Sequence, residues 1–235
     1  MSIRLFDCRP RADYEVGHVP GAVHLDPETT LSTPSADPSI GGRHPLPDPH
    51  ALGAAFADAG IGPDTFVLAL DEGTGWAARC WWLLRHLGHD ACGTVDIRAY
   101  SGPLVSEAPR LERAAFLPRV RDDDLIDADE ILARLDDRSL ALLDARSPER
   151  WRGDAEPLDP VAGRIPGARN AFFELPLPDD ATEPPELVAY CGSGVTACVV
   201  AQRLVLAGRE DVRLYPGSFS EWCRNPSNPI ERGDP

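Results

Sequence analysis

Short apolar runs alternate with longer stretches of helical periodicity along most of this chain. Runs of 4 to 6 mostly apolar residues, such as 66–70 and 187–190, have the length and composition of buried strands. The longer stretches, which have apolar positions at helical spacing or are apolar nearly all round, lie at 49–59, 76–87 and 197–207. A glycine, a typical helix stop signal, follows each of them directly. The alternation predicts an α/β fold of small parallel sheets flanked by helices.

The same pattern occurs twice. Each half contains an apolar strand that ends in Asp-x-Arg and then a Gly-x-x-Pro-Gly-Ala turn; the strands lie at 5–9 and 143–146 and the turns at 17–22 and 163–168. A later apolar strand runs into Asp71 in the first half and into Cys191 in the second, 120 residues further on. The glycines that close the following helices have the same spacing, so this stretch repeats without gaps. The repeat predicts two tandem domains of one fold.

The boundary between the halves is predicted near residues 106–122. Two prolines and charges of both signs argue for a linker there rather than a core element. We therefore expect a first domain at 1–108, a linker at about 109–122 and a second domain at 123–235.

Residues 186–197 place a cysteine between a strand and a helix. Cys191 directly follows the strand, and Gly192 and Gly194 give the next turn conformational freedom. Unpaired N–H groups at a helix N-terminus carry the positive end of the helix dipole and favour an anion such as a thiolate or a persulfide. In parallel sheets, ligands bind beyond the carboxyl ends of the strands, which is where Cys191 falls. A buried structural cysteine is the alternative, and this stretch by itself leaves both interpretations open.

Composition and charge narrow the classes of partner. The hydrophobic content of 43% argues for globular structure, and no run approaches the roughly 18 apolar residues of a membrane span. The net charge of −15 makes nucleic acid and anionic membranes poor partners, so a site for a small anion must rely on local arginines and backbone dipoles. The first residues show no signal-peptide apolar core, which predicts a cytoplasmic protein. Six scattered cysteines without a Cys-x-x-Cys pair argue against a disulfide framework or a zinc site.

These motifs together resemble the tandem-domain sulfurtransferases of the rhodanese superfamily, which comprise thiosulfate and 3-mercaptopyruvate sulfurtransferases. The resemblance covers essentially the whole chain, and it rests on the Asp-x-Arg strand ends, the Gly-x-x-Pro-Gly-Ala turns, Trp81-Trp82, Cys-Gly-Ser-Gly-Val-Thr at 191–196 and Gly-Ser-Phe-Ser-Glu-Trp at 217–222. In this family the first domain is usually inactive and the second carries the nucleophile. Asp71 stands here at the position equivalent to Cys191, so the resemblance implies two rhodanese-like domains of which the first is inactive.

The resemblance implies a ping-pong transfer of a sulfane sulfur. Cys191 would attack the outer sulfur of the donor, hold it as a persulfide and pass it to a thiophilic acceptor such as cyanide, a thiol or thioredoxin. The N–H groups of the loop would cradle the terminal sulfur, which makes Gly192, Gly194, Val195 and Thr196 candidate binding residues. The reaction needs no metal or organic cofactor. We favour a monomer that binds neither nucleic acid nor membrane.

The composition of the cysteine loop indicates the donor. In the family, Gly-Ser-Gly-Val-Thr after the cysteine accompanies a preference for 3-mercaptopyruvate, and basic residues there accompany a preference for thiosulfate. In the former group the serine handles protons together with an aspartate of the first domain; the matching residues here are Ser193 and Asp26, with His44 near that aspartate. Without the resemblance, Ser193 would be interpreted as a turn residue and His44 as a surface-loop histidine.

Arginines are the expected ligands of a substrate carboxylate, because the planar guanidinium offers paired donors. Arg150 aligns with a substrate arginine of the family. A second arginine is expected nine residues later, where this chain has Asp159, and Arg152 or Arg164 from the same loop is a candidate replacement. Arg146, at an Asp-x-Arg strand end, is predicted to form a structural ion pair.

Other functions compete with transfer from 3-mercaptopyruvate. A thiosulfate sulfurtransferase, moving sulfur from thiosulfate to cyanide, would use the same scaffold. A cysteine phosphatase of related fold would need an arginine six positions after the cysteine to bind phosphate, and residue 197 is alanine. A non-catalytic sulfur carrier or binding module does not explain why the second half keeps a thiol in an anion cradle. The other cysteines, among them Cys198 in the helix after the loop, are interpreted as small packing residues.

Overall fold

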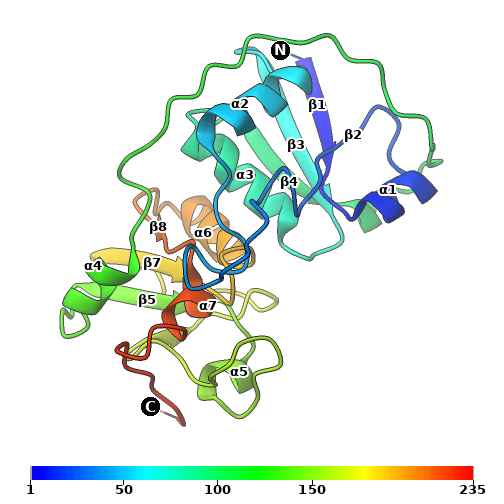
Figure 1. Ribbon diagram of the computed structural model, residues 1–235. Coiled ribbons are helices and arrows are strands. Elements are labelled where there is room, and N and C mark those ends of the chain that lie inside the picture. Colours follow the sequence, from blue (N-terminus) through cyan, green and yellow to red (C-terminus); the bar gives the residue numbers. More distant parts are fainter. Residues whose placement is uncertain (1, 235) are drawn as a thin grey trace. The chain divides into compact units, whose positions relative to one another are not determined.

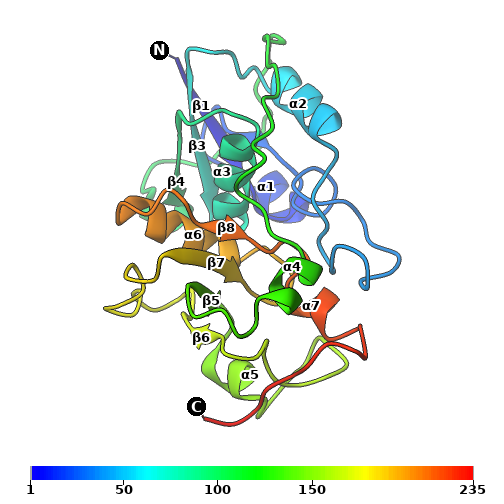
Figure 2. The same ribbon diagram turned by 90° about the vertical axis from the view of Figure 1, so that its left-hand side faces the viewer.

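A computed structural model describes residues 2–234 (Figures 1 and 2). The chain divides into two compact units. The first comprises the residues up to Thr33 together with Leu46–Arg121, and the second comprises Pro34–Pro45, here called the inserted segment, together with the residues from Asp122 onward. Over the described residues, no helix is long and apolar enough to cross a membrane.

The first unit is built on a four-stranded parallel sheet. In chain order its elements are β1 (Ser2–Asp7), α1 (Arg11–Val16), β2 (Val23–His24), α2 (Pro49–Asp58), β3 (Thr65–Asp71), α3 (Trp76–His86), β4 (Cys92–Asp96) and the 3-10 helix η1 (Ile97–Ala99). The strand order is β2-β1-β3-β4. Phe6 of β1 stacks on Phe56 of α2 with ring centroids 6.1 Å apart, while Leu70 of β3 packs in a separate cluster with Ile97. Both faces of the sheet are therefore covered, as is usual for parallel strands.

The second unit repeats this architecture. Its elements are α4 (Ala128–Ala133), β5 (Leu140–Asp144), α5 (Pro148–Arg152), β6 (Arg169–Asn170), β7 (Glu186–Tyr190), α6 (Ala197–Leu206), β8 (Arg213–Leu214) and α7 (Ser218–Trp222). The strand order is β6-β5-β7-β8, again all parallel. The second sheet therefore has the same order as the first, with β7 in the place of β3.

Helices cover both faces of the second sheet (Figure 2). Val188 and Tyr190 of β7 belong to a core cluster with residues of α4 and α7. The intervening residues Leu187 and Ala189 are also buried and face the other side, because side chains alternate along a strand; α6 packs against β7 and β8. Strand β7 is thus buried on both faces, and it ends one residue before Cys191.

The α/β fold predicted from the sequence is confirmed, with two parallel sheets flanked by helices. The helices predicted at 49–59, 76–87 and 197–207 are α2, α3 and α6. Each ends one residue earlier than predicted, because the last residue of the predicted range is the C-cap.

The unit to which two segments belong, the predicted linker and the inserted segment, differs from the domain boundaries predicted from the sequence. The backbone N–H groups of Arg119 and Arg121 donate to carbonyls at the end of α3, at 2.9 and 2.8 Å. Most of the stretch predicted as a linker, 109–122, therefore packs with the first unit. The inserted segment belongs to the second unit although it lies within the predicted first domain, 1–108.

Candidate functional site

Both units secure the end of their first long strand with the same ion pair. Arg9 binds both carboxylate oxygens of Asp7 and donates at 2.8 Å to the carbonyl of the first glycine in the following turn. Arg146 makes the same bonds to Asp144 and the corresponding glycine, also at 2.8 Å. Burial lowers the pKa of the Arg146 guanidinium, but the charge and hydrogen bonds of Asp144 outweigh it, and the pKa is raised overall. The predicted structural ion pair is confirmed.

The thiol of Cys191 is enclosed by the loop that follows β7. Only 2% of the residue is exposed. Sγ accepts hydrogen bonds from the backbone N–H groups of Ser193 and Gly194, at 3.4 and 3.1 Å. Gly194 has φ +79°, and a side chain there would collide with the carbonyl of Pro216. A glycine at this position therefore lets the loop curl its amides around the sulfur.

Helix α7 holds the outer side of the same loop. The N–H groups of Phe219 and Ser220 donate to the carbonyls of Cys191 and Gly192, at 3.0 and 2.9 Å. The hydroxyl of Ser218 accepts from the N–H of Cys191 at 3.1 Å. Because these carbonyls are engaged by α7, the next N–H groups of the loop are free to face the thiol. The Gly-Ser-Phe-Ser-Glu-Trp sequence at 217–222 therefore orients the cysteine loop.

The equivalent loop of the first unit is filled by a side chain. The Asp71 carboxylate accepts from the backbone N–H groups of Gly73, Gly75 and Ala77 at 3.0, 2.8 and 3.2 Å, and from the Thr74 hydroxyl at 2.9 Å. These donors satisfy the buried charge. The first unit thus contains the same cradle with a built-in anion.

In the second unit part of this cradle is open. The N–H groups of Val195 and Thr196 make no hydrogen bond to any of residues 2–234, and neither reaches Sγ. Val195 lies 120 residues after Gly75, whose N–H binds the carboxylate in the first unit. The loop can therefore take one more anionic atom beyond the thiol sulfur.

Two of the predicted proton-handling residues lie side by side. The Nδ1 atom of His44, in the inserted segment, is 2.8 Å from the Oγ atom of Ser193. The backbone N–H of Ser193 is also a donor to the thiol. Asp26 lies in the first unit, where its carboxylate accepts the N–H groups of Glu28 and Thr29, and its participation stays a prediction.

The inserted segment is anchored to α7. Gly41 donates its N–H to the Glu221 carboxylate at 2.7 Å, and Arg43 donates its N–H to the Ser220 hydroxyl at 3.0 Å. Gly42 has φ +76°, and a Cβ there would lie 2.7 Å from the Ser220 hydroxyl oxygen and closer still to a backbone carbonyl. Only glycine therefore permits this approach.

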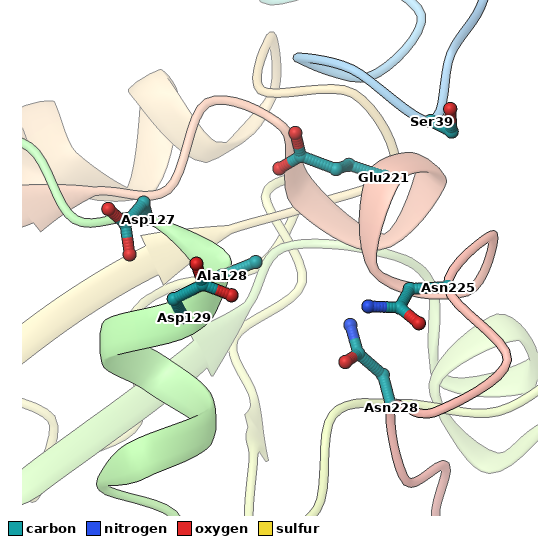
Figure 3. Close-up of a pocket in the computed structure, with 7 residues that line it drawn as sticks. All are labelled: Ser39, Asp127, Ala128, Asp129, Glu221, Asn225 and Asn228. Carbon is teal, nitrogen blue, oxygen red and sulfur yellow. The ribbon is translucent and has the colours of Figure 1, made fainter.

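Glu221 connects the anchor to an acidic pocket of the second unit (Figure 3). Its other carboxylate oxygen accepts the Tyr215 hydroxyl at 2.7 Å. Burial, followed by the charge of Glu221, raises the pKa of Tyr215, so the phenol remains a neutral donor. The pocket has a volume of about 270 Å³ and is lined by Ser39, Asp127, Ala128, Asp129, Glu221, Asn225 and Asn228. The carboxylates of Asp127 and Glu221 accept hydrogen bonds from Glu130, Gly41 and Tyr215, and we assign the pocket a structural role.

Two guanidinium groups lie against Gly192, the residue after the cysteine. A Cβ at this position would be 2.9 Å from Nη2 of Arg43 and 3.2 Å from Nη2 of Arg150. Arg150, the predicted substrate ligand, comes from α5, and Arg43 comes from the inserted segment. Their side chains are 18% and 21% exposed respectively, so both can be reached from solvent.

Asp159 is the acid at which these arginines meet. Its side chain is completely buried. One carboxylate oxygen accepts from Arg43 and, at 2.8 Å, from Arg224, and the other accepts from Arg150 at 3.5 Å. Glu156, also buried, binds Nε and Nη2 of Arg150 at 3.1 and 2.7 Å. Each buried carboxylate is thus paired with guanidinium groups, as its desolvation requires.

The chain matches one protein family along most of its length. The family described as "Rhodanese-like domain" matches residues 1–102 and again 127–225. This chain belongs to the rhodanese family. The two matches correspond to the two sheets, so this rhodanese has its domains in tandem.

Relatives of this rhodanese carry sulfurtransferase names. The Pseudomonas aeruginosa protein named "Probable 3-mercaptopyruvate sulfurtransferase" is 41% identical over 246 residues, which cover 94% of this chain and 86% of the relative. The thiosulfate sulfurtransferase of Rattus norvegicus is 31% identical over 253 residues, with 95% and 84% covered. The crystal structure of Tum1 from Saccharomyces cerevisiae has the same fold, with a TM-score of 0.80 and 20% sequence identity. The match covers 100% of this chain and 93% of the Tum1 chain. The chain is a tandem-domain sulfurtransferase.

The two arginines suggested as replacements at position 159 are engaged elsewhere in this rhodanese. Arg152 donates to Asp154 at 2.8 Å and, within residues 2–234, forms no ion pair with Glu156 or Asp159. Arg164 is buried, pairs with Glu231 and stacks over the Trp151 ring at 4.0 Å. Sequence spacing suggested these residues because they are near in the chain, whereas Arg43 is near only in space.

The remaining cysteines fit the packing interpretation. Burial raises the pKa of Cys92 to about 12 and that of Cys223 to about 11, and it raises the pKa of Cys8 well above its usual value. These thiols stay neutral near pH 7 and are poor nucleophiles. Cys198 is buried in α6 and donates its S–H to the Gly194 carbonyl at 3.3 Å.

The sequence did not predict that Arg43 and Arg224 lie at this site or that both pair with Asp159. Arg43 precedes His44 and follows two glycines, Gly41 and Gly42, and this pair was the one local sign that the chain approaches another element closely there.

Proposed function

We propose that this sulfurtransferase takes its sulfur from 3-mercaptopyruvate, holds it as a persulfide on Cys191 and delivers it to a thiophilic acceptor such as cyanide, a thiol or thioredoxin. The half-filled cradle carries this proposal, because Sγ engages two N–H groups and leaves those of Val195 and Thr196 open. The first unit supports it, since in the equivalent loop the N–H of Gly75, which corresponds to that of Val195, binds the carboxylate of Asp71. A cytoplasmic location is part of the same proposal.

The transfer balances without an outside oxidant. The Cys191 thiolate attacks the donor sulfur, an S–S bond forms, and the C–S bond of 3-mercaptopyruvate breaks with its electron pair going to carbon. The donor's thiol proton ends on that carbon, which gives pyruvate. The outer sulfur, about 2.05 Å beyond Sγ, extends toward the open N–H groups of the loop. In the second half-reaction the acceptor attacks this sulfur, and Cys191 leaves as a thiolate.

Ser193 and His44 are the proposed proton carriers. Their hydrogen bond of 2.8 Å is short enough for direct proton transfer. Imidazole accepts and returns protons near neutral pH, so the pair can take the proton of the donor thiol and return it to the carbon of the leaving pyruvate. Asp26 is proposed to assist them, as the family resemblance implies.

Thiosulfate is the second candidate donor. The arginines around Gly192 suit a dianion as well as a carboxylate, and the rat relative is named a thiosulfate sulfurtransferase. Initial rates with each donor at a fixed cyanide concentration separate the candidates. We expect a higher kcat/KM with 3-mercaptopyruvate, and an equal or higher value with thiosulfate would overturn the choice of donor.

The covalent intermediate is tested by mass spectrometry of the intact protein and of its peptides. After exposure to 3-mercaptopyruvate without acceptor, we expect one added sulfur atom on the peptide that contains Cys191. Addition of cyanide should remove it and form thiocyanate. An unmodified Cys191 peptide in an enzyme that turns over would contradict the persulfide mechanism.

A further inference from the structure

Guanidinium N–H groups are left over beside the thiol after the ion pairs have formed. Arg43 binds Asp159 through Nη1, and Arg150 binds Glu156 and Asp159 through Nε and Nη2. Within residues 2–234, no hydrogen bond occupies Nη2 of Arg43 or Nη1 of Arg150. A Cβ on Gly192 would be 2.9 Å from the first of these atoms and 3.4 Å from the second. The unused donors of both arginines therefore lie together at the residue next to Cys191.

The cluster is positive although the protein carries a net charge of −15. Four guanidinium groups meet three carboxylates in one connected set: Arg43, Arg146, Arg150 and Arg224 with Asp144, Glu156 and Asp159. One positive charge is in excess, and the two side chains at Gly192 are partly open to solvent. A partly enclosed positive charge attracts small anions to this point against the overall field.

We propose that Arg43 and Arg150 form a two-arginine clamp for the donor's carboxylate, and that Asp159 is the positioning residue that holds the clamp. The inference rests on the proposed function, because it names the group that recognises the donor. A carboxylate between Nη2 of Arg43 and Nη1 of Arg150 lies next to Gly192, one residue from the thiol. In 3-mercaptopyruvate two carbons separate the sulfur from the carboxylate carbon, so a short 2-oxo acid can reach both groups.

Gly192 and Asp159 have complementary parts in this clamp. Glycine leaves the space that both guanidinium groups enter, which any side chain would fill. Asp159 accepts from Arg43 and Arg150 on different oxygens and so fixes the distance between them. Fixing flexible arginine side chains in advance reduces the entropy lost when the carboxylate binds.

Steady-state kinetics of Arg43→Gln test the clamp. We expect the KM for 3-mercaptopyruvate to rise about 10- to 100-fold, while kcat changes less than about threefold, because the lost bonds are made in both the ground and the transition state. Arg43→Lys should recover only part of the loss, since an ammonium lacks the fork of a guanidinium. Arg169→Gln is the matched control, because Arg169 also pairs with an aspartate of the second unit but lies in β6.

Inhibition by pyruvate isolates carboxylate binding from sulfur transfer. Pyruvate keeps the carboxylate and lacks the sulfur, so its inhibition constant should rise in Arg43→Gln by about the same factor as KM. Asp159→Asn should raise both the KM for 3-mercaptopyruvate and the inhibition constant of pyruvate, and should change kcat less. If Asp159 were only structural, the substitution would lower the melting temperature without raising these two constants more than it changes kcat. Unchanged KM and unchanged pyruvate inhibition in folded Arg43→Gln would overturn the clamp.

The persulfide experiment separates failure of the clamp from failure of the proposed function. Arg43→Gln exposed to saturating 3-mercaptopyruvate should still add a sulfur atom to Cys191, as the wild type does. If the wild type gains no sulfur from this donor, the proposed function is wrong and the clamp falls with it. If the wild type gains sulfur and Arg43→Gln keeps its KM, the clamp alone is wrong.

Discussion

The loops after β3 and β7 share one backbone plan but hold different anions. The Asp71 carboxylate fills its loop and accepts three backbone N–H groups and one hydroxyl. The Cys191 thiol accepts two N–H groups, and the N–H groups of Val195 and Thr196 in its loop have no hydrogen-bond acceptor among the described residues. The same cradle of backbone N–H groups thus has a structural role in the first unit, whereas in the second unit it leaves donors unoccupied.

The residues next to the two anions differ as well. Glu72, after Asp71, pairs with Arg9 at 3.3 Å and is half-exposed. Gly192, after Cys191, has no side chain and is flanked by Arg43 and Arg150. The first loop is therefore bordered by an acid and, at Gly73, by the guanidinium group of Arg98, whereas the second is bordered by two guanidinium groups at the residue after the cysteine. The following experiments test whether these two differences account for the location of activity.

Replacement of the nucleophile should have the largest effect. Cys191→Ser should lower sulfur transfer by at least about 1000-fold, because a hydroxyl can neither attack the donor sulfur nor store it as a persulfide. Cys198→Ala, which removes a buried thiol from α6, should stay within about threefold of the wild type. Assays of thiocyanate formation measure both, and retained activity in Cys191→Ser would contradict the assignment.

Moving the thiol to the other loop tests the surroundings. The double variant Asp71→Cys, Cys191→Ser should remain below about 1% of wild-type activity, because Glu72 repels an anionic donor and occupies the position at which Gly192 leaves room for the clamp. Substantial sulfur transfer by this variant would show that a thiol in a cradle of backbone N–H groups is sufficient for activity without the neighbouring arginines.

Loss of the proposed proton carrier, Ser193, should have the next largest effect. Ser193→Ala should lower kcat with 3-mercaptopyruvate about 100-fold, the usual contribution of a positioned acid or base. Its backbone N–H remains, so the bond to Cys191 Sγ is kept. A smaller loss with thiosulfate, whose reaction has no thiol proton to move, would sharpen the assignment of Ser193 to proton transfer. An equal loss with both donors would argue instead for a positional role.

Gly42→Ala should have a smaller effect on the same site. A Cβ at this position collides with α7 and the loop before it, so the inserted segment must move and take Arg43 and His44 with it. We expect kcat/KM for 3-mercaptopyruvate to fall about tenfold, because displacement of a positioning group by about 1 Å is costly. The mutation Gly21→Ala is the matched control, because Gly21 of the first unit also has a positive φ and an added Cβ there would meet no other residue within 4 Å.

Changes at Asp71 should alter stability rather than activity. Asp71→Asn places an amide donor among the N–H groups that now bind a carboxylate, and we expect the free energy of unfolding of the first unit to fall by about 1–3 kcal/mol. Urea unfolding followed by circular dichroism measures this loss. Transfer activity under native conditions should stay within about twofold, and a large loss of activity with unchanged stability would contradict a structural role for Asp71.

Local signals in the sequence were sufficient to predict the fold and to single out Cys191 as the candidate nucleophile. Strand β7, Cys191 and α6 follow one another without a gap, so apolar periodicity and two glycines predicted their order and nearly their limits. The comparison of Asp71 with Cys191 needed only the 120-residue spacing of the repeat. These features depend on neighbours in the chain, and short-range conformational preferences determine them.

Tertiary structure decided which arginines meet at the thiol. The chain has Asp159 where the family pattern predicts a second arginine, and Arg152 and Arg164 were the substitutes predicted from their nearness in the chain. The structure brings Arg43 to Asp159 from 116 residues away, through the inserted segment and its glycine contact with α7. The glycine pair before Arg43 indicates a close approach but not its partner, because a buried carboxylate selects its partners by their distance in space and not by their position in the chain.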